Sequence, residues 1–241
     1  MNVIQVDTYE ELSKKAAEII INKVKQNPSA KLGLATGSTP VGSYKLMIED
    51  HKRNGTSYED IITVNLDEYV GLNADHPSSY RFFMDEQLFD SININKKNTH
   101  VPNGTAEDLK AECKKYEAMI DELGGLDLQL LGIGQNGHIG FNEPGTPFNS
   151  VTHVVDLTPN TRDVNSRFFS SIEEVPTKAI TMGIASILKS KEILLLISGE
   201  AKAEALHKLL HGNIDESFPA SALKNHPNFT VIFDKAALKG V

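Results

Sequence analysis

The stretch that decides the fold of this chain is residues 130–144, LLGIGQNGHIGFNEP. It joins the end of an apolar strand to a glycine-rich loop, and it fits two different kinds of α/β protein. The spacing G-x-G-x-x-G at residues 132–137 matches the glycine fingerprint of dinucleotide-binding folds. In the same loop, His138 and Glu143 are the residue types of an acid–base pair, in which a carboxylate orients an imidazole.

The residues that follow this loop argue against a dinucleotide site. In such a site the glycines open a helix of several turns, and an acidic residue follows about 20 positions later. Asp156 satisfies the second condition, but residues 139–151 contain Pro144 and Pro147 together with two further glycines. Because proline and glycine interrupt helices, we interpret residues 132–145 as a tight loop.

Short apolar runs alternate with amphipathic stretches along most of the chain. The runs predicted as strands are Val3–Val6, Lys31–Ala35, Ile61–Leu66, Asp127–Ile133, His153–Leu157, Ile193–Ser198 and Thr230–Phe233. Helices are predicted after a capping box at Thr8, from Val41, over Ser78–Phe89, from Thr105 to Gly124, and over Ala201–Leu210. The alternation predicts one α/β domain over residues 1–241, with a mostly parallel, doubly wound, Rossmann-like sheet of about seven strands and helices on both faces.

Composition excludes several classes of partner. The net charge of −8 argues against a surface for nucleic acid or for an anionic membrane. The chain has no basic, apolar leader at its start and no run of about 18 apolar residues. Cys113 is the single cysteine, which suits a reducing compartment, and its helical setting offers no catalytic partner. We expect a soluble cytoplasmic protein.

The turns after the predicted strands carry the polar chemistry. In parallel sheets, ligands bind beyond the carboxyl ends of the strands. Gly37, Ser38 and Thr39 follow one strand and precede a predicted helix, which suits a phosphate, although either hydroxyl is equally suited to capping that helix.

Two further turns carry charged side chains. Asp67 and Glu68 end another strand, where a carboxylate serves either as a general base or as a helix cap. Because neighbouring strand residues point in opposite directions, at most one of the two acids faces the site. Lys202 falls in the first turn of a predicted helix, where the helix dipole disfavours a cation. Either an anionic ligand binds this lysine, or its side chain is solvated.

Together these motifs resemble the glucosamine-6-phosphate deaminase family. The matching segments are Leu34–Pro40, Asn65–Leu72, Gly137–Pro144 and Asn165–Phe169, and the resemblance covers almost the whole chain. It implies that the enzyme opens the ring of a phosphosugar substrate, moves a proton from C2 to C1 through an enol, and expels ammonia, leaving fructose 6-phosphate. It implies no redox cofactor and no metal.

The resemblance also assigns roles to residues. Asp67 corresponds to the base that takes the C2 proton, and His138 to the ring-opening acid and base, oriented by Glu143 and Asn136. The residues that correspond to the phosphate site are Gly37, Ser38, Thr39, Arg167 and Lys202. Residues 159–174, which contain Arg167, correspond to a lid.

Two departures from the family pattern change the expectation. Allosteric members carry Asp where this chain has Asn136, which orients an imidazole but cannot stabilise its charge. Residues 145–155 lack the serine and Arg-x-Lys pattern that binds N-acetylglucosamine 6-phosphate in those members, and the sequence ends soon after Asp234. We therefore expect an unregulated enzyme; both a monomer and a homo-oligomer remain open, and these departures favour the monomer.

Two alternatives remain open from the sequence. A 6-phosphogluconolactonase-like hydrolase shares the phosphate loop but needs no C2 base at Asp67. A non-enzymatic sugar-phosphate-sensing domain keeps the phosphate site and loses the chemistry. The joint presence of Asp67, His138 and Glu143 favours the deaminase.

Overall fold

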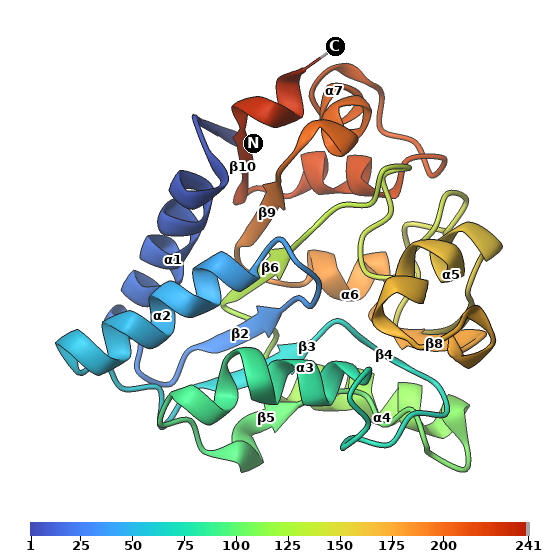
Figure 1. Cartoon of the computed structure of the whole chain (residues 1–241), viewed down its shortest axis with the longest axis horizontal. Coiled ribbons are helices and arrows are strands. Elements are labelled where there is room, and N and C mark those ends of the chain that lie inside the picture. Colours follow the sequence, from blue (N-terminus) through green and yellow to red (C-terminus); the bar gives the residue numbers. More distant parts are fainter. Residues whose placement is uncertain (240–241) are drawn as a thin grey trace.

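Seven parallel strands form the central sheet of the protein (Figure 1). The computed structural model describes residues 1–239, without the side chains of Asn160, Val164 and Phe168. Across the sheet the strands are, in order, β1 (Asn2–Val6), β10 (Phe229–Asp234), β9 (Ile193–Ile197), β6 (Leu128–Leu131), β2 (Lys31–Leu34), β3 (Ile62–Asn65) and β5 (Thr99–His100). This confirms the predicted parallel sheet of about seven strands.

Helices cover both faces of this sheet. One face carries α1 (Tyr9–Gln26), α2 (Val41–Asn54) and α3 (Tyr80–Gln87), and the other carries α4 (Leu109–Glu122), α6 (Ile184–Leu188) and α7 (Ala203–His211). The alternation of strand side chains divides the core between the two faces. In β9, Leu194 and Leu196 pack with α1 and α2, whereas Leu195 and Ile197 pack with the second group.

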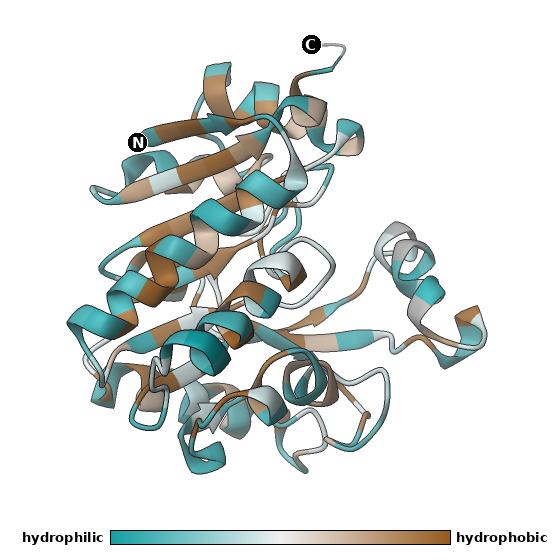
Figure 2. Cartoon of the chain, turned by 60° about the vertical axis from the view of Figure 1, so that its left-hand side comes forward, coloured by the Kyte–Doolittle hydropathy of each residue, from teal (hydrophilic) through white to brown (hydrophobic). Residues whose placement is uncertain are grey.

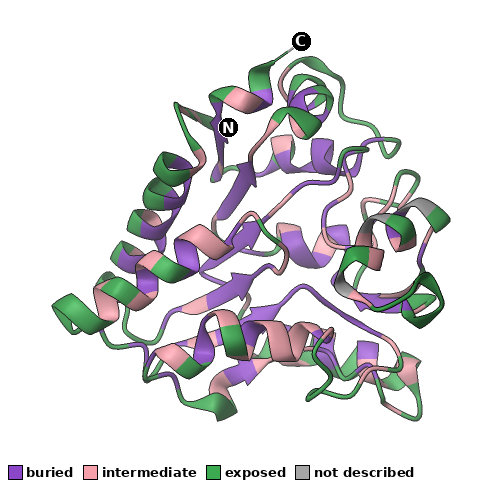
Figure 3. Cartoon of the chain, viewed as in Figure 1, coloured by how far each residue is buried: buried purple, intermediate pink, exposed green. Residues whose placement is uncertain are grey.

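Burial and hydropathy follow this layering. Figure 3 shows the inner strands of the sheet largely buried, whereas the edge strand β1 has only exposed and half-buried residues, and Figure 2 shows hydrophobic residues concentrated on the inner strands. The helices carry the exposed, hydrophilic residues around the sheet. Within residues 1–239, no helix combines the length and the apolar character needed to cross a membrane.

The helix starts follow local capping chemistry. The predicted cap of α1 is confirmed, because the Thr8 hydroxyl accepts from the Glu11 N–H at 3.2 Å. The predicted start of α4 at Thr105 is wrong, because the Asn103 side chain holds Thr105 in a turn. Helix α4 begins at Leu109, after Asp108 accepts from the Ala111 N–H at 3.0 Å.

A second, smaller sheet stands beside the first. It contains β4 (Asp67–Tyr69), β8 (Lys178–Thr181) and β7 (His153–Asp156), and both of its strand pairs are antiparallel. The predicted strand at residues 153–157 therefore exists, but it lies outside the seven-stranded sheet, and the two-residue β5 takes the seventh place. Strand β4 was not predicted separately because it follows β3 after the single residue Leu66.

Between β7 and β8 the chain forms the segment that corresponds to the expected lid. It contains α5 (Pro159–Asn165), which Thr158 caps, and two short 3₁₀ helices, η3 (Ser166–Phe168) and η4 (Ile172–Glu174). The other 3₁₀ helices are η1 (Phe89–Ser91), η2 (Lys96–Asn98), η5 (Glu200–Lys202), η6 (Pro219–Asn225) and η7 (Lys235–Leu238). We call residues 158–175 the lid segment. Its Phe169 packs edge-on against Tyr69 of β4, with ring centroids 5.6 Å apart.

The strand order creates one natural binding edge. The chain runs from β2 to β3 to β5 in one direction and from β6 to β9 to β10 in the other, so the order reverses between β6 and β2. Ligands of open α/β sheets bind at such a reversal, outside the carboxyl ends of the strands. Figure 1 shows that β2 points toward the side on which α5 and β8 lie.

Candidate active site

Asp67 is a buried carboxylate at the start of β4. Its backbone pairs with Thr181 of β8, and the residue is 6% exposed. Burial, followed by the negative charge of Glu68, raises the pKa of Asp67 to about 8. Among the described residues no hydrogen-bond donor reaches its side chain. The Asp67 anion is therefore poorly stabilised, which makes this carboxylate a strong proton acceptor.

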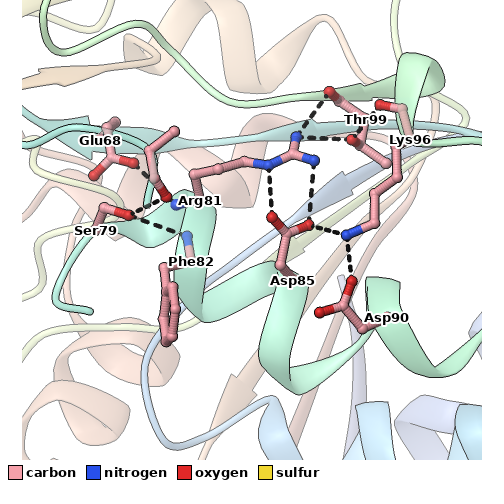
Figure 4. A network of polar contacts seen from close by, with 9 residues as sticks. Glu68, Ser79, Arg81, Phe82, Asp85, Asp90, Lys96 and Thr99 are labelled. Atoms are coloured by element: carbon pink, nitrogen blue, oxygen red, sulfur yellow. Dashed lines mark hydrogen bonds and ion pairs between the residues drawn. The ribbon is translucent and has the colours of Figure 1, made fainter. Parts of the chain in front are cut away.

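Glu68 has the opposite surroundings, although it is the next residue. Its carboxylate accepts the N–H groups of Tyr69, Tyr80 and Arg81 at 2.8, 2.9 and 2.9 Å, so it holds the start of α3 (Figure 4). Burial raises the pKa of Glu68 to about 6, and these three N–H groups oppose the rise. The two side chains point in different directions, as expected for neighbouring strand residues: Glu68 accepts from the start of α3, while Asp67 lies toward the loop after β6.

That loop is the glycine-rich stretch, and its glycines make room for side chains. A Cβ added to Gly134 would stand 2.2 Å from atoms of the His138 ring. A Cβ added to Gly140 would stand 2.8 Å from Thr181 Oγ1 and 3.4 Å from Asp67 Oδ2. Residues 139–151 form turns rather than a helix, as expected for a loop that does not bind a dinucleotide. The glycines therefore bring the His138 loop close to Asp67.

The His138 imidazole is connected through Asn136 to Glu143. His138 Nδ1 lies 2.8 Å from Asn136 Oδ1 and 3.7 Å from Glu143 Oε1, and Asn136 Nδ2 donates to Glu143 Oε2 at 2.7 Å. Because a carboxylate only accepts, the Asn136 amide turns its NH₂ to Glu143 and its oxygen to His138. The neutral imidazole therefore carries its proton on Nδ1, which leaves the Nε2 lone pair available for proton exchange.

Electrostatics keep this imidazole neutral. Burial lowers the pKa of His138, the Glu143 carboxylate opposes that change, and the Lys202 ammonium lowers the pKa further. At neutral pH His138 is therefore poised to accept a proton before it donates one. The effect of Lys202 also shows that the turn after β9 approaches the loop after β6.

The turn after β2 is organised by backbone contacts. Gly37 has a φ of +88°, a conformation that glycine adopts without strain. The Tyr9 hydroxyl donates to the carbonyls of Ser38 and Thr39 at 3.1 Å each and accepts the Gly42 N–H at 2.9 Å. Helix α2 is capped by Pro40 without any side-chain hydrogen bond. The alternative that Ser38 or Thr39 serves as the helix cap is therefore wrong.

Two cations lie near the same rim. Lys202 ends η5, and burial followed by the positive charge of Arg167 lowers its pKa. Arg167 belongs to η3 of the lid segment. The turn that carries Lys202 is fixed by Asp234, whose carboxylate accepts the Gly199 N–H at 3.1 Å. Two like charges held together are unfavourable unless an anion binds between them, so the pair suits a phosphate.

Most of the site residues predicted from the sequence follow neighbouring strands of the main sheet. Four adjacent strands of the sheet, β9, β6, β2 and β3, each lead into one part of the site. Lys202 follows β9, the loop with Asn136, His138 and Glu143 follows β6, the turn at residues 37–39 follows β2, and Asp67 follows β3. Arg167 reaches this group from the lid segment, outside the main sheet. Sequence reasoning missed Tyr9, whose role has no local sequence signal, and Thr181 of β8, whose strand was not predicted.

Other features of the molecule are weaker candidates. A cavity of about 550 Å³ lies at the opposite edge of the sheet, against the amino ends of β9 and β10. Its charged side chain, Glu192, pairs with Lys23 at 2.5 Å. Within residues 1–239, no three His, Cys, Asp or Glu side chains are placed to hold a metal ion.

Comparisons with known proteins agree on the family. Residues 5–232 match the family model of glucosamine-6-phosphate isomerases and 6-phosphogluconolactonases. A glucosamine-6-phosphate deaminase of Geobacillus sp. (strain WCH70) is 58% identical over 238 residues, which cover 99% of this chain and 95% of the relative. Glucosamine-6-phosphate deaminase 1 of Bacillus subtilis (strain 168) is 56% identical over 237 residues, which cover 98% of each chain.

Solved structures extend the comparison. The structure of a monomeric glucosamine-6-phosphate deaminase superposes with a TM-score of 0.97 at 55% identity, covering 99% of this chain and 100% of the other. A 6-phosphogluconolactonase from Trypanosoma cruzi superposes with a TM-score of 0.80 at 20% identity, covering 100% and 96%. The second likeness shows the shared fold alone.

Proposed function

The chain belongs to the family of glucosamine-6-phosphate isomerases and 6-phosphogluconolactonases, and we propose that it converts glucosamine 6-phosphate and water to fructose 6-phosphate and ammonium. The observation that carries this proposal is the unsolvated carboxylate of Asp67, with a pKa of about 8, on the same rim as a neutral imidazole. Deprotonation next to a carbonyl requires such a base.

Substrate binding begins at the phosphate. The hydroxyls of Ser38 and Thr39 and the backbone at Gly37 bind the phosphate oxygens, and Arg167 and Lys202 neutralise its charge. These two cations attract the phosphate locally, although the whole chain carries a net charge of −8. The dianion also relieves the repulsion between the two cations, so binding stabilises the lid segment that carries Arg167.

His138 opens the sugar ring. Nε2 takes the proton of the C1 hydroxyl, the bond between C1 and the ring oxygen breaks, and the imidazolium returns its proton to that oxygen. The contact with Asn136 fixes the required tautomer throughout. Glu143, which accepts from Asn136, stabilises the imidazolium at a distance of 3.7 Å. The product of this step is the open-chain amino aldehyde.

Asp67 then moves the proton. Its carboxylate takes the proton from C2, the electron pair forms the C1–C2 double bond, and the aldehyde oxygen gains a second proton from solvent to give an enol. Return of a proton to C1 forms the C2 iminium, which water hydrolyses to the C2 ketone with release of ammonium. A base whose pKa lies near the working pH takes and returns the proton with similar ease.

The neighbouring reaction of the family, lactone hydrolysis, fits this site less well. Hydrolysis of an ester needs an activated water and no base at C2, so it leaves the buried, donor-free Asp67 without a role. Burial of the Asp67 carboxylate costs free energy, and the hydrolysis of a lactone would gain nothing from that cost.

Three further properties belong to the proposal. The enzyme acts as a monomer, which is supported by its likeness to a relative described as monomeric. It is not activated by N-acetylglucosamine 6-phosphate, and it acts in the cytoplasm without nucleic acid, membrane, metal or redox cofactor. Light scattering and kinetics with and without that activator test the first two properties; a stable oligomer or sigmoidal kinetics would contradict them.

The function itself is tested with purified protein and glucosamine 6-phosphate. We expect fructose 6-phosphate and ammonium in equal amounts, with hyperbolic dependence on substrate. 6-Phosphogluconolactone, supplied at the same concentration, is the matched control and should be hydrolysed no faster than without protein. Absence of ammonium, or hydrolysis of the lactone instead, would overturn the proposal.

A further inference from the structure

Thr161 of α5 reaches from the lid segment into the catalytic group. Its residue is 7% exposed, and its hydroxyl donates to Glu143 Oε1 at 2.6 Å. The other oxygen of that carboxylate, Oε2, accepts from Asn136 Nδ2 at 2.7 Å. Glu143 is therefore held on one side by its own loop and on the other by the lid segment.

The direction of this hydrogen bond is fixed by a second threonine. Thr158 donates from its hydroxyl to Thr161 Oγ1 at 2.9 Å, and it accepts the Thr161 N–H at 3.1 Å. Because Thr158 already caps α5, the Thr161 hydroxyl is not needed to start the helix. Its proton is directed to Glu143, and the chain of donors runs from the lid segment to the carboxylate.

The lid segment has other anchors. Arg162 donates from Nη2 to the carbonyls of Ile172 and Val175 at 3.0 Å each, which closes the segment on itself. The ring contact between Phe169 and Tyr69 fixes it against β4. Loss of one hydroxyl at Thr161 therefore leaves the segment folded, and its consequence falls on the orientation of Glu143.

We propose that Thr161 is a positioning residue that couples the seating of the lid segment to the alignment of His138. When α5 is in place, Thr161 holds the Glu143 carboxylate so that the Asn136 amide presents its oxygen to His138 Nδ1. The same segment carries Arg167, so phosphate binding and preparation of the ring-opening imidazole occur together. The inference rests on the proposed function, since it concerns the ring-opening step.

Three variants test the inference. Thr161→Val has nearly the same shape and loses the donor, whereas Thr161→Ser keeps it. Thr152→Val is the matched control, because Thr152 is also buried and donates to a carboxylate, Glu117 Oε2, at 2.7 Å outside the site. The three are compared with the parent in kcat and KM for glucosamine 6-phosphate. Binding of 2-amino-2-deoxyglucitol 6-phosphate, an open-chain analogue that needs no ring opening, is measured in parallel.

We expect Thr161→Val to lower kcat by about 10- to 100-fold, because misplacement of a catalytic group by about 1 Å costs up to that much. KM and the dissociation constant of the analogue should change by less than about threefold, since Asp67 and the phosphate contacts are intact. Thr161→Ser should restore most of kcat, and Thr152→Val should leave both constants near those of the parent.

Three outcomes would overturn the inference. They are an unchanged kcat in Thr161→Val, a parallel loss of kcat and analogue binding, or a Ser variant as slow as the Val variant. Ammonium release by the parent enzyme shows whether a failure concerns this inference or the proposed function on which it rests. If the parent releases no ammonium, the proposed function fails; if the parent is active and Thr161→Val equals it, only the coupling fails.

Discussion

Asp67 and Glu143 are two carboxylates of one site, and they differ in the hydrogen-bond donors that surround them. Asp67 lies on β4, where burial and the negative charge of Glu68 raise the pKa of its carboxyl to about 8, and no hydrogen-bond donor among the described residues reaches that carboxyl. Glu143 lies on the loop after β6 and accepts one donor at each oxygen, from Asn136 and from Thr161.

The difference separates two kinds of catalytic work. A carboxylate without donors gains most from taking a proton, which suits abstraction from carbon. A carboxylate with a donor at each oxygen is stabilised as an anion and fixed in direction, which suits orientation of an imidazole. The lid segment contacts Glu143 and leaves the Asp67 side chain without a donor, so its seating acts on ring opening and not on the C2 base.

The largest expected effect comes from Asp67→Asn. We expect kcat to fall by about 10²- to 10⁴-fold, the usual contribution of a general base, with little change in KM because the phosphate contacts remain. Glu143→Gln, which changes the other carboxylate, is the matched comparison and should retain more activity. Ammonium release measures both, and equal losses would remove the distinction between the two carboxylates.

The same substitution tests the burial of Asp67 through stability. The pKa of Asp67 in the folded protein, about 8, lies above its ordinary value of 3.8. Ionisation therefore disfavours the fold as pH rises between these two values. We expect the stability advantage of Asp67→Asn over the parent to grow from pH 4 to pH 8 in thermal melts. An advantage that does not change with pH would show that the carboxylate is solvated.

A smaller loss of kcat is expected from His138→Gln, which changes the imidazole that Glu143 orients. Sugar rings open slowly without a catalyst, so we expect a reduction in kcat of about 10²-fold, within the range for general acid–base catalysis. Hydrogen exchange at C2 should fall by the same factor, because Asp67 acts on the open chain. Exchange that persists at the parent rate would show that ring opening does not depend on His138.

Asn136→Asp tests how the residue between Glu143 and His138 sets the pKa of the imidazole. A carboxylate at this position loses the donor to Glu143 and adds a negative charge beside His138, which raises the pKa of the imidazole. The limb of the pH–rate profile that reports on His138 should shift to higher pH, with kcat within about tenfold of the parent. An unchanged limb would place that titration elsewhere.

The smallest effect on activity is expected from Glu68→Gln. The negative charge of Glu68 is the second cause that raises the pKa of Asp67. Its removal should lower that pKa, so the rise in activity with pH should begin at lower pH. Loss of charged acceptors at the start of α3 should also lower the free energy of unfolding by about 1–3 kcal/mol. An acid limb that stays in place would show that burial alone tunes Asp67.

Patterns of neighbouring residues predicted much of this arrangement. The apolar runs predicted six of the seven strands of the central sheet, and the carboxyl-end rule pointed to the turns that carry Asp67, His138, Ser38 and Lys202. The interruption of residues 139–151 by prolines and glycines correctly removed the dinucleotide interpretation. These features depend on periodicity and turn chemistry, which are local.

Features that depend on distant contacts were not predictable in this way. Strand β5 has two residues and exists because β3 pairs with it, so it has no pattern of its own. A strand was predicted at residues 153–157 and exists as β7 (His153–Asp156), but its place in the smaller sheet depends on β8. The contacts of Tyr9 with the turn after β2 and of Thr161 with Glu143 join segments that no sequence spacing relates.

Isotope exchange tests the central claim, that Asp67 is the base and His138 with Glu143 serves the ring. Glucosamine 6-phosphate is incubated in deuterated water with the parent and with Asp67→Asn, and deuterium at C2 of the substrate and at C1 of fructose 6-phosphate is followed by NMR. The parent should place deuterium at these carbons, and Asp67→Asn should bind the substrate and place none. Exchange by Asp67→Asn at the parent rate would contradict the account.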